Sequence, residues 1–262
     1  MTRWGGVERM LVDYLTYPDQ KKFNHVLMST SSKSEIVEPI INAGTPFFQP
    51  KRRVHYDPSA ILQMAKWLRS EQIQLIHTYN ATATAWGILA AFLAKEPLCL
   101  VGEHGSVWSV QPPLLWLNHW AYHRSDLVLA NSFATKRMLE HKYKIPEEKI
   151  RVVYNAVASL PETDVDQVRS NLCLHADLIV GSVGRLDTPK DYATFVNSAA
   201  SVLKVRDDVQ FILVGGGPQE RRLNALIREL GIQDRFFMMG WRGDAREIIQ
   251  VFDIFVSTSI RE

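Results

Sequence analysis

Cysteine is scarce in this 262-residue sequence, which contains only Cys99 and Cys173. The two lie far apart and lack the spacing of metal ligands, so the sequence predicts no zinc site. Each has apolar neighbours, and we interpret both as reduced core residues of a cytosolic protein.

Long hydrophobic runs and a leader pattern are also missing. The longest apolar stretches, residues 81–94 and 107–117, are too short or too interrupted to span a bilayer. The first residues lack the basic-then-apolar layout of a signal peptide. The composition, 46% hydrophobic and 22% charged, is that of an ordinary globular protein. We therefore expect a cytoplasmic protein that is soluble or peripheral on the inner face of a membrane.

Charge of one sign does not dominate, because the net charge is only +2. Residues 1–160 contain 18 lysine and arginine residues against 13 acidic ones, and residues 161–262 contain 12 against 15. The basic first half would suit an anionic membrane surface, but so small an imbalance is also ordinary variation. No basic stripe alternates with aromatic residues, so nucleic-acid binding is not expected.

Short apolar runs alternate with helical patterns along almost the whole chain. This alternation predicts an α/β protein with parallel sheets and crossover helices. A stretch of small and polar residues at 155–166 interrupts the pattern, and we place a domain boundary there. The prediction is two Rossmann-like domains, 1–158 and 159–262, facing a cleft, with ligands at the carboxyl ends of the strands. The predicted strands are 24–29, 74–77, 98–102, 127–130, 151–154, 178–183, 209–214, 235–239 and 254–257, and the main predicted helices are 57–70, 81–94, 113–123, 132–141, 192–204 and 220–230.

The turn GRLDTPKD at residues 184–191 lies between a predicted strand and a predicted helix. It places Arg185 and Lys190 close to a helix N-terminus, which itself attracts anions. Two cations at such a position indicate a receptor for a diphosphate. An alternative remains open, in which Arg185 only pairs with Asp187 or Asp191 on the surface.

Three other turns carry glycine or histidine at predicted strand or helix ends. In LVGGGPQE, residues 213–220, the three glycines indicate either a sharp turn or a close approach of the backbone to another group. Glu220 stands where a dinucleotide fingerprint has glycine, which disfavours a nicotinamide-dependent dehydrogenase. Gly5 and Gly6 open an amphipathic helix in a way that suits an approaching phosphate. His104 ends a buried strand, where it is either structural or in contact with a ligand.

Taken together, these motifs resemble the family 4 glycosyltransferases of GT-B fold, which retain the anomeric configuration of the transferred sugar. The resemblance covers nearly the whole chain, and the order and spacing of the motifs make it specific. It rests on the following segments: Gly-Gly-x-Glu-Arg at 5–9, the strand-end His104, VVYNAV at 152–157, GSVGRLDTPKD at 181–191, ILVGGGP at 212–218, GWRGD at 240–244 and DIFVSTSIRE at 253–262.

The resemblance assigns roles to the first group of residues around the donor diphosphate. It implies that Arg185 and Lys190 hold the diphosphate and stabilise the negative charge on the departing nucleotide. Cations already in place need not reorganise as that charge develops. The resemblance also implies that Gly5 and Gly6 touch the same phosphates from the first domain.

The resemblance further implies which residues meet the sugar and the base. His104 matches a histidine that contacts the reacting sugar near its anomeric centre, and Glu262 matches a glutamate that contacts the donor sugar. Trp241 lies in the loop whose backbone contacts the nucleobase, and its side chain either helps or simply packs. No metal and no cofactor are expected, only a UDP-, GDP- or ADP-sugar donor and a glycan or lipid-linked acceptor. Such an enzyme would act in polysaccharide or glycolipid biosynthesis.

Both ends of the chain depart from the family pattern. Only four residues precede Gly5, where a first strand is expected, and the chain stops at Glu262, before a second family glutamate. We therefore expect a truncated glycosyltransferase with an incomplete second domain. A GT-B sugar-nucleotide epimerase and a non-catalytic nucleotide-sugar-binding fragment remain as alternatives.

Aromatic residues and histidines in the first half leave further questions open. His77 ends another predicted strand and either is structural or lines the acceptor side. The segment 107–124 contains Trp108, Trp116 and Trp120, which pack against the sheet or rest on a membrane. His119 and His123 have helical spacing, but without a third ligand they do not predict a metal site. The donor base, the sugar and the acceptor are not specified by the sequence.

Overall fold

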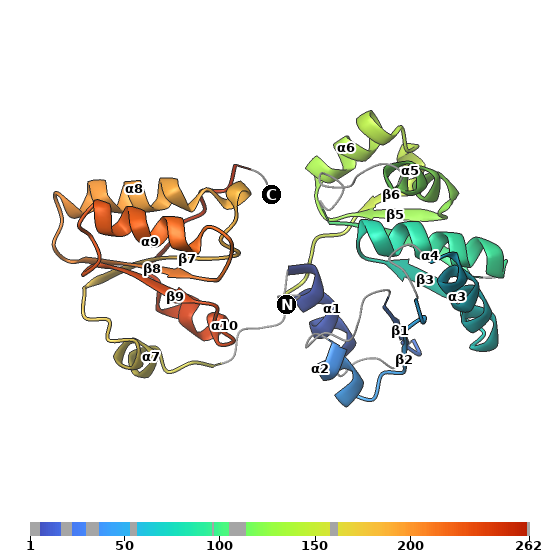
Figure 1. The fold of residues 1–262 in the computed structure, drawn as a ribbon, viewed down its shortest axis with the longest axis horizontal. Coiled ribbons are helices and arrows are strands. Elements are labelled where there is room, and N and C mark those ends of the chain that lie inside the picture. Colours follow the sequence, from blue (N-terminus) through green and yellow to red (C-terminus); the bar gives the residue numbers. More distant parts are fainter. Residues whose placement is uncertain are drawn as a thin grey trace. The chain divides into compact units, whose positions relative to one another are not determined.

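The computed structural model describes residues 6–16, 23–29, 37–52, 57–95, 97–104, 114–157 and 162–260 (Figure 1). Contacts between Cα atoms divide the chain into two units, Met1–Ala158 and Ser159–Glu262. Each unit has its own parallel sheet and its own hydrophobic core, and each is described by itself.

Unit 1 is built on a four-stranded parallel sheet with the strand order β3-β4-β5-β6. Helices connect the strands in sequence, and the core lies between the sheet and these helices. The strands are β3 (Leu75–Thr78), β4 (Leu98–Glu103), β5 (Leu127–Ala130) and β6 (Ile150–Val152), and the helices are α3 (Pro58–Ser70), α4 (Ala81–Ala94), α5 (Leu114–Arg124) and α6 (Phe133–Tyr143). Glu103 is paired with Ala130, and Ala130 with Val152, so the carboxyl ends of β4, β5 and β6 lie level.

Side-chain caps fix where the helices of unit 1 begin. The Asn80 side chain accepts a hydrogen bond of 2.9 Å from the Ala83 amide at the start of α4, and the Ser132 hydroxyl accepts one of 3.1 Å from Thr135 at the start of α6. Since α4 is apolar on most of its surface, it packs between α3 and α5. Each cap follows directly on a strand, which makes the strand-to-helix turns well defined.

The first part of unit 1 forms a small layer that packs on the main core through Met28 and Phe48. It contains α1 (Gly6–Thr16), β1 (Leu27–Met28), α2 (Val37–Asn42) and β2 (Phe47–Phe48). Among the residues that the structure describes, β1 and β2 pair in parallel with each other and with no further strand, and Val12, Leu15 and Ile40 form a small cluster of their own. The strand predicted at 24–29 is shorter than expected, since β1 comprises only Leu27–Met28.

Unit 2 has a parallel sheet with the order β10-β7-β8-β9 and helices on both faces (Figure 1). Both faces of β8 are buried, which explains its unbroken apolar sequence. Phe195, Phe211 and Phe236 pack on one face and Ile179, Ile212 and Ile248 on the other. The elements are α7 (Val165–Asn171), β7 (Leu178–Val183), α8 (Tyr192–Leu203), β8 (Val209–Val214), α9 (Glu220–Glu229), β9 (Phe236–Gly240), α10 (Ala245–Ile248) and β10 (Ile254–Phe255), with 3₁₀ turns at Thr188–Lys190 (η3) and Ile249–Val251 (η4).

The α/β class with parallel sheets is confirmed, because all strand pairings recorded between described residues are parallel. The prediction for the cysteines is wrong for one of the two. Cys99 is buried on β4, but Cys173 is exposed, at a left-handed turn (φ 54°) that follows α7. Within the part of the chain that the structure describes, no helix is both long and apolar enough to cross a membrane.

Candidate functional site

The carboxyl ends of β7, β8 and β9 lead into three loops that are hydrogen-bonded to one another. The Gly184 amide donates to the Val214 carbonyl at 2.9 Å, and the Leu186 amide donates to the Gly216 carbonyl at 3.2 Å. The Gly215 amide donates to the Gly240 carbonyl at 2.8 Å. These bonds satisfy backbone groups that follow the strands and form a continuous rim at one end of the sheet.

Close packing between two of these loops explains the glycines of LVGGGPQE. Gly215 has φ +143°, and a Cβ atom there would overlap the Gly184 carbonyl oxygen. A Cβ atom on Gly217 would lie 2.7 Å from the carbonyl carbon of Leu186. Of the two interpretations of this motif, the close approach is therefore correct, and the approaching group is the backbone of the preceding loop.

Arg185 lies on this rim with its side chain 72% exposed. Its Nε donates to Oδ2 of Asp187 at 2.6 Å, and the Asp187 side chain is 15% exposed. The other oxygen of Asp187, Oδ1, is buried and has no hydrogen-bond partner among the described residues. The ion pair between Arg185 and Asp187, which the sequence analysis left open as an alternative, is thus present. It holds the guanidinium of Arg185 near the end of β7.

Lys190 ends η3, directly before α8, as the sequence predicts for a cation at a helix N-terminus. Its carbonyl accepts a hydrogen bond of 3.0 Å from Thr258 Oγ1, and the Pro189 carbonyl accepts one of 2.9 Å from the Ile260 amide. The segment after β10 is therefore attached to η3. Asp191, at φ 44°, turns the chain from η3 into α8.

Trp241 follows the carboxyl end of β9 and is 54% exposed. It does not belong to the described hydrophobic clusters of unit 2, so the interpretation that it simply packs is not supported. Gly240 before it has φ +65°, which turns the chain out of the strand. Trp241 therefore follows directly on Gly240, whose carbonyl is part of the same rim.

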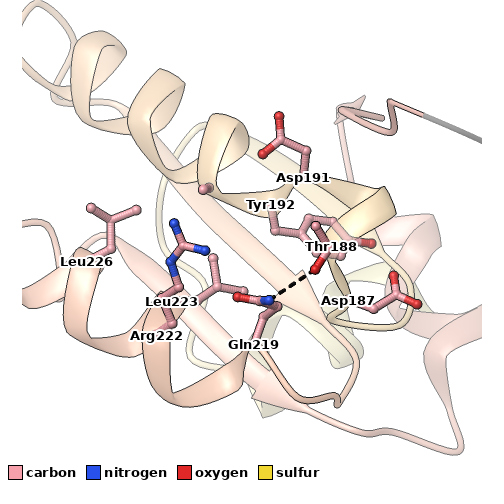
Figure 2. A pocket seen from close by; sticks show the side chains of 9 residues that line it. Asp187, Thr188, Asp191, Tyr192, Gln219, Arg222, Leu223 and Leu226 are labelled. Atoms are coloured by element: carbon pink, nitrogen blue, oxygen red, sulfur yellow. Dashed lines mark hydrogen bonds between the residues drawn. The ribbon is translucent and has the colours of Figure 1, made fainter.

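A small cavity of about 80 Å³ lies beside the rim, between η3, the start of α8 and the first turns of α9 (Figure 2). Gln219 Nε2 donates to Thr188 Oγ1 at 3.2 Å and so joins η3 to the start of α9. A second hollow, of about 310 Å³, lies along β10 and α8 and is lined mainly by apolar side chains. Arg185 and Lys190 line neither of them, so we do not assign the diphosphate to either.

In unit 1, His77 and His104 lie at the carboxyl ends of the neighbouring strands β3 and β4. The ring of Tyr79 lies 4.2 Å from the His77 ring and is stacked on the His104 ring at 5.8 Å, measured between centroids. Burial, and to a smaller extent the neighbouring His104, lower the pKa of His77 to about 4. Burial also lowers the pKa of His104, and a hydrogen bond with the Asn155 side chain opposes this shift. Burial therefore disfavours the charged form of both imidazoles.

Behind His104, on the other face of β4, Glu103 is completely buried. Tyr122 on α5 donates a short hydrogen bond to its Oε2 atom. Burial, and then the carboxyl group of Glu103, raise the pKa of Tyr122. The sequence analysis did not identify this pair, although an acidic residue inside an apolar strand was a signal that could have found it.

Two of the predicted site residues, Gly5 and Glu262, and also Trp108, lie outside the described residues. Gly6 begins α1, and the space beside its Cα is open. Trp116 on α5 is 76% exposed, whereas Trp120 packs against the core of unit 1. His123 Nε2 lies 3.1 Å from the Tyr143 carbonyl, and the described residues contain no group of three or more side chains suited to a metal ion.

Both units match family models of glycosyltransferases. The model described as Glycosyltransferase Family 4 matches residues 4–159, and the one described as Glycosyl transferases group 1 matches residues 164–262. A galactosyltransferase of Escherichia coli, UDP-Gal:alpha-D-GlcNAc-diphosphoundecaprenol alpha-1,3-galactosyltransferase, is 23% identical over 79% of this chain and 57% of its own length. An N-acetylgalactosaminyltransferase of Campylobacter jejuni that acts on a diphospho-undecaprenol-linked sugar is 26% identical over 54% of this chain and 37% of its own. The chain thus spans about half the length of these curated relatives.

Solved structures show the same fold. HepE of Anabaena in complex with UDP-glucose has a TM-score of 0.81 at 21% identity, over 99% of this chain and 72% of its own. The lipopolysaccharide outer core galactosyltransferase WaaB in its apo form has a TM-score of 0.70 at 17% identity, with the same coverage. The GT-B fold predicted from the motifs is confirmed by this likeness.

Proposed function

Because the chain belongs to glycosyltransferase family 4, we propose that it transfers a sugar from a nucleoside-diphosphate sugar to a glycan or lipid-linked acceptor, with retention at the anomeric carbon. The observation that carries the proposal is the rim of unit 2. It presents Arg185 and Lys190 at the end of β7 and at the start of α8, within the region that the group 1 model matches.

The proposed chemistry breaks the bond between the anomeric carbon and the diphosphate oxygen. The electron pair remains on the diphosphate, so negative charge grows there as the bond breaks. Arg185 and Lys190 stabilise this charge, and the N-terminus of α8 adds its dipole. The acceptor hydroxyl forms the new bond to the sugar and passes its proton to an oxygen of the departing diphosphate. His104 contacts the sugar, and the loop at Trp241 contacts the base. Gly5, Gly6 and Glu262 complete the proposed set.

The names of the curated relatives indicate which donor and acceptor to propose. The matched galactosyltransferase is named for a UDP-sugar donor, and both curated relatives are named for acceptors linked to diphospho-undecaprenol. We therefore propose a UDP-sugar as the donor and a lipid-diphosphate-linked glycan as the acceptor, in the synthesis of a polysaccharide or glycolipid. Exposed Trp116, on a helix that also carries Arg124, supports a peripheral contact with the membrane that would hold such an acceptor.

Isothermal titration calorimetry with UDP, GDP and ADP tests the proposal. We expect one nucleotide to bind to the chain, and the double variant Arg185→Ala, Lys190→Ala to lose at least about 100-fold in affinity, since two charge-assisted contacts are removed. A double variant with the same charge change, Lys204→Ala, Arg206→Ala, lies at the other end of α8 and should bind like the original chain.

The two variants separate a diphosphate site from general electrostatic attraction. Equal losses in both variants would mean that the nucleotide responds only to net charge. Failure of all three nucleotides to bind to a folded chain would contradict the proposal itself.

A further inference from the structure

The short turn that carries Lys190 has weak internal support. The turn, η3, spans only Thr188–Lys190. The Lys190 amide donates to the Asp187 carbonyl at 3.2 Å, and the amide of Asp191 closes the turn at the same distance, both at the long end of the usual range. A 3₁₀ turn also has poorer hydrogen-bond geometry than an α-helix. The position of η3 therefore depends on groups from other parts of the chain.

Two hydrogen bonds reach η3 from the segment that follows β10. The Thr258 hydroxyl donates to the Lys190 carbonyl at 3.0 Å. The Ile260 amide donates to the Pro189 carbonyl at 2.9 Å. Thr258 and Lys190 are both half-buried, so water competes only in part for the bond between them. The bond from Thr258 is the one that ends on Lys190 itself and that a change of side chain can remove.

The same segment is fixed to the sheet at its other end. Ser182, which is buried on β7, donates from its Oγ to the Val256 carbonyl at 2.7 Å. The Val256 amide donates to the Gly181 carbonyl at 2.9 Å. A path of hydrogen bonds thus leads from β7 through residues 256–260 to the backbone of Lys190. The sheet therefore supports Lys190 by a route other than the loop that precedes it.

The start of α9 also contacts this loop, but at other points (Figure 2). Gln219 Nε2 donates to Thr188 Oγ1 at 3.2 Å, and the Gln219 amide donates to the Leu186 carbonyl at 3.0 Å. These bonds end on Thr188 and Leu186, before Lys190 in the chain. The contacts from α9 therefore do not replace the bond from Thr258.

A lysine depends strongly on its backbone for the placement of its charge. The ammonium is a point charge on a flexible stem, so a shift of the main chain moves the region that the charge can reach. Arg185 differs, because its side chain is itself held by the pair with Asp187. A cation that stabilises developing charge must be in place before the reaction. For Lys190, the main chain has to provide that order.

We infer that Thr258 is a positioning residue for the diphosphate: its hydroxyl holds the Lys190 carbonyl, and with it the point from which the Lys190 side chain extends, in a fixed position relative to β7. Since β7 leads directly into Arg185, one strand supports both cations. The inference rests on the proposed function, because this contact affects binding only if Lys190 binds the diphosphate.

Calorimetry on the whole chain tests the inference with UDP, GDP and ADP, and the nucleotide that binds most tightly is used for all variants. Thr258→Val keeps the shape of the side chain but removes the hydroxyl, and we expect the dissociation constant to rise about threefold to tenfold. Thr258→Ser keeps the hydroxyl and should restore most of the affinity.

Thr163→Val is the matched control. Thr163 is also half-buried, and its hydroxyl accepts a hydrogen bond of 2.8 Å from Gln250 Nε2. Neither residue belongs to the rim, so this variant should bind the nucleotide like the original chain.

A double-mutant cycle separates positioning from a general loss of stability. If Thr258 acts through Lys190, Thr258→Val should cause no further loss of affinity in a chain that already carries Lys190→Ala. An equal loss in both backgrounds, no loss in Thr258→Val, or no recovery in Thr258→Ser would overturn the inference. If Lys190→Ala still weakens binding in that case, the diphosphate site stands. Unchanged binding by Lys190→Ala would overturn the role of Lys190 and the inference with it, and a folded chain that binds no nucleotide would overturn both proposals.

Discussion

At the scale of single residues, the ion pair between Arg185 and Asp187 decides how the rim of unit 2 can work. An exposed pair of this kind is worth about 0.2–1 kcal/mol. A charge-assisted hydrogen bond to a phosphate oxygen is worth about 1.5–3 kcal/mol. We therefore expect a diphosphate to compete successfully for Arg185. The observed pair with Asp187 and the proposed diphosphate site, which the sequence presented as alternatives, would then be the free and the bound arrangement of the same side chain.

Removal of the Asp187 charge should make the nucleotide bind more tightly. Asp187→Asn keeps the shape of the side chain but releases Arg185 and removes a negative charge near the proposed diphosphate. We expect the dissociation constant measured by calorimetry to fall about threefold to tenfold, which corresponds to roughly 1 kcal/mol.

The control for this prediction is Asp208→Asn, because Asp208 forms the same kind of pair with Arg206 two residues away, at the start of β8. It should leave the affinity unchanged. Weaker binding by Asp187→Asn would show instead that the carboxylate positions Arg185 for the ligand.

At the scale of elements, short apolar runs bounded by turn residues predicted most strands of both sheets, because buried parallel strands are apolar and short. The pattern missed β2, with two residues, and α2, α7 and α10, with four to seven, because such short segments carry too few residues to show a period. It also could not say what approaches Gly215, because the partner, Gly184, belongs to another loop. The meeting of His77 and His104 depends in the same way on the pairing of β3 with β4.

The contact between the β7 and β8 loops predicts a large effect for Gly215→Ala. The added methyl group would collide with the Gly184 carbonyl, and alanine would also be strained at φ +143°. We expect the free energy of unfolding of unit 2, measured by urea denaturation, to fall by about 3 kcal/mol or more.

Gly231→Ala provides the matched control, since Gly231 also has a positive φ, of +67°, but has open space around its Cα. It should cost only about 1–2 kcal/mol, the backbone term alone. Equal losses in the two variants would mean that the loop contact does not constrain Gly215.

At the scale of the whole molecule, the proposed chemistry is divided between two units with separate cores. His104, which we propose contacts the sugar, follows a strand of unit 1, and Arg185 and Lys190, which we propose bind the diphosphate, follow a strand of unit 2. The sequence placed a boundary near Ser159 because the alternation of strands and helices is interrupted there, and the chain also divides at this residue by its contacts. The motifs identified Arg185 and Lys190 directly, whereas the stacking of Tyr79 on the His104 ring became visible only in three dimensions.

Separate cores predict two unfolding transitions in differential scanning calorimetry. The nucleotide identified by titration should raise the midpoint of one transition, that of unit 2, because its main contacts are proposed to lie on that rim. At a concentration 100 times the dissociation constant, the stabilisation should be about 2.7 kcal/mol. Gly215→Ala should lower the same transition and leave the other in place, which assigns it to unit 2. The variant Arg185→Ala, Lys190→Ala should abolish the nucleotide effect without moving either midpoint strongly. If a single transition were seen and the nucleotide shifted it as a whole, the two cores would unfold as one cooperative unit, and nucleotide binding would stabilise both cores together.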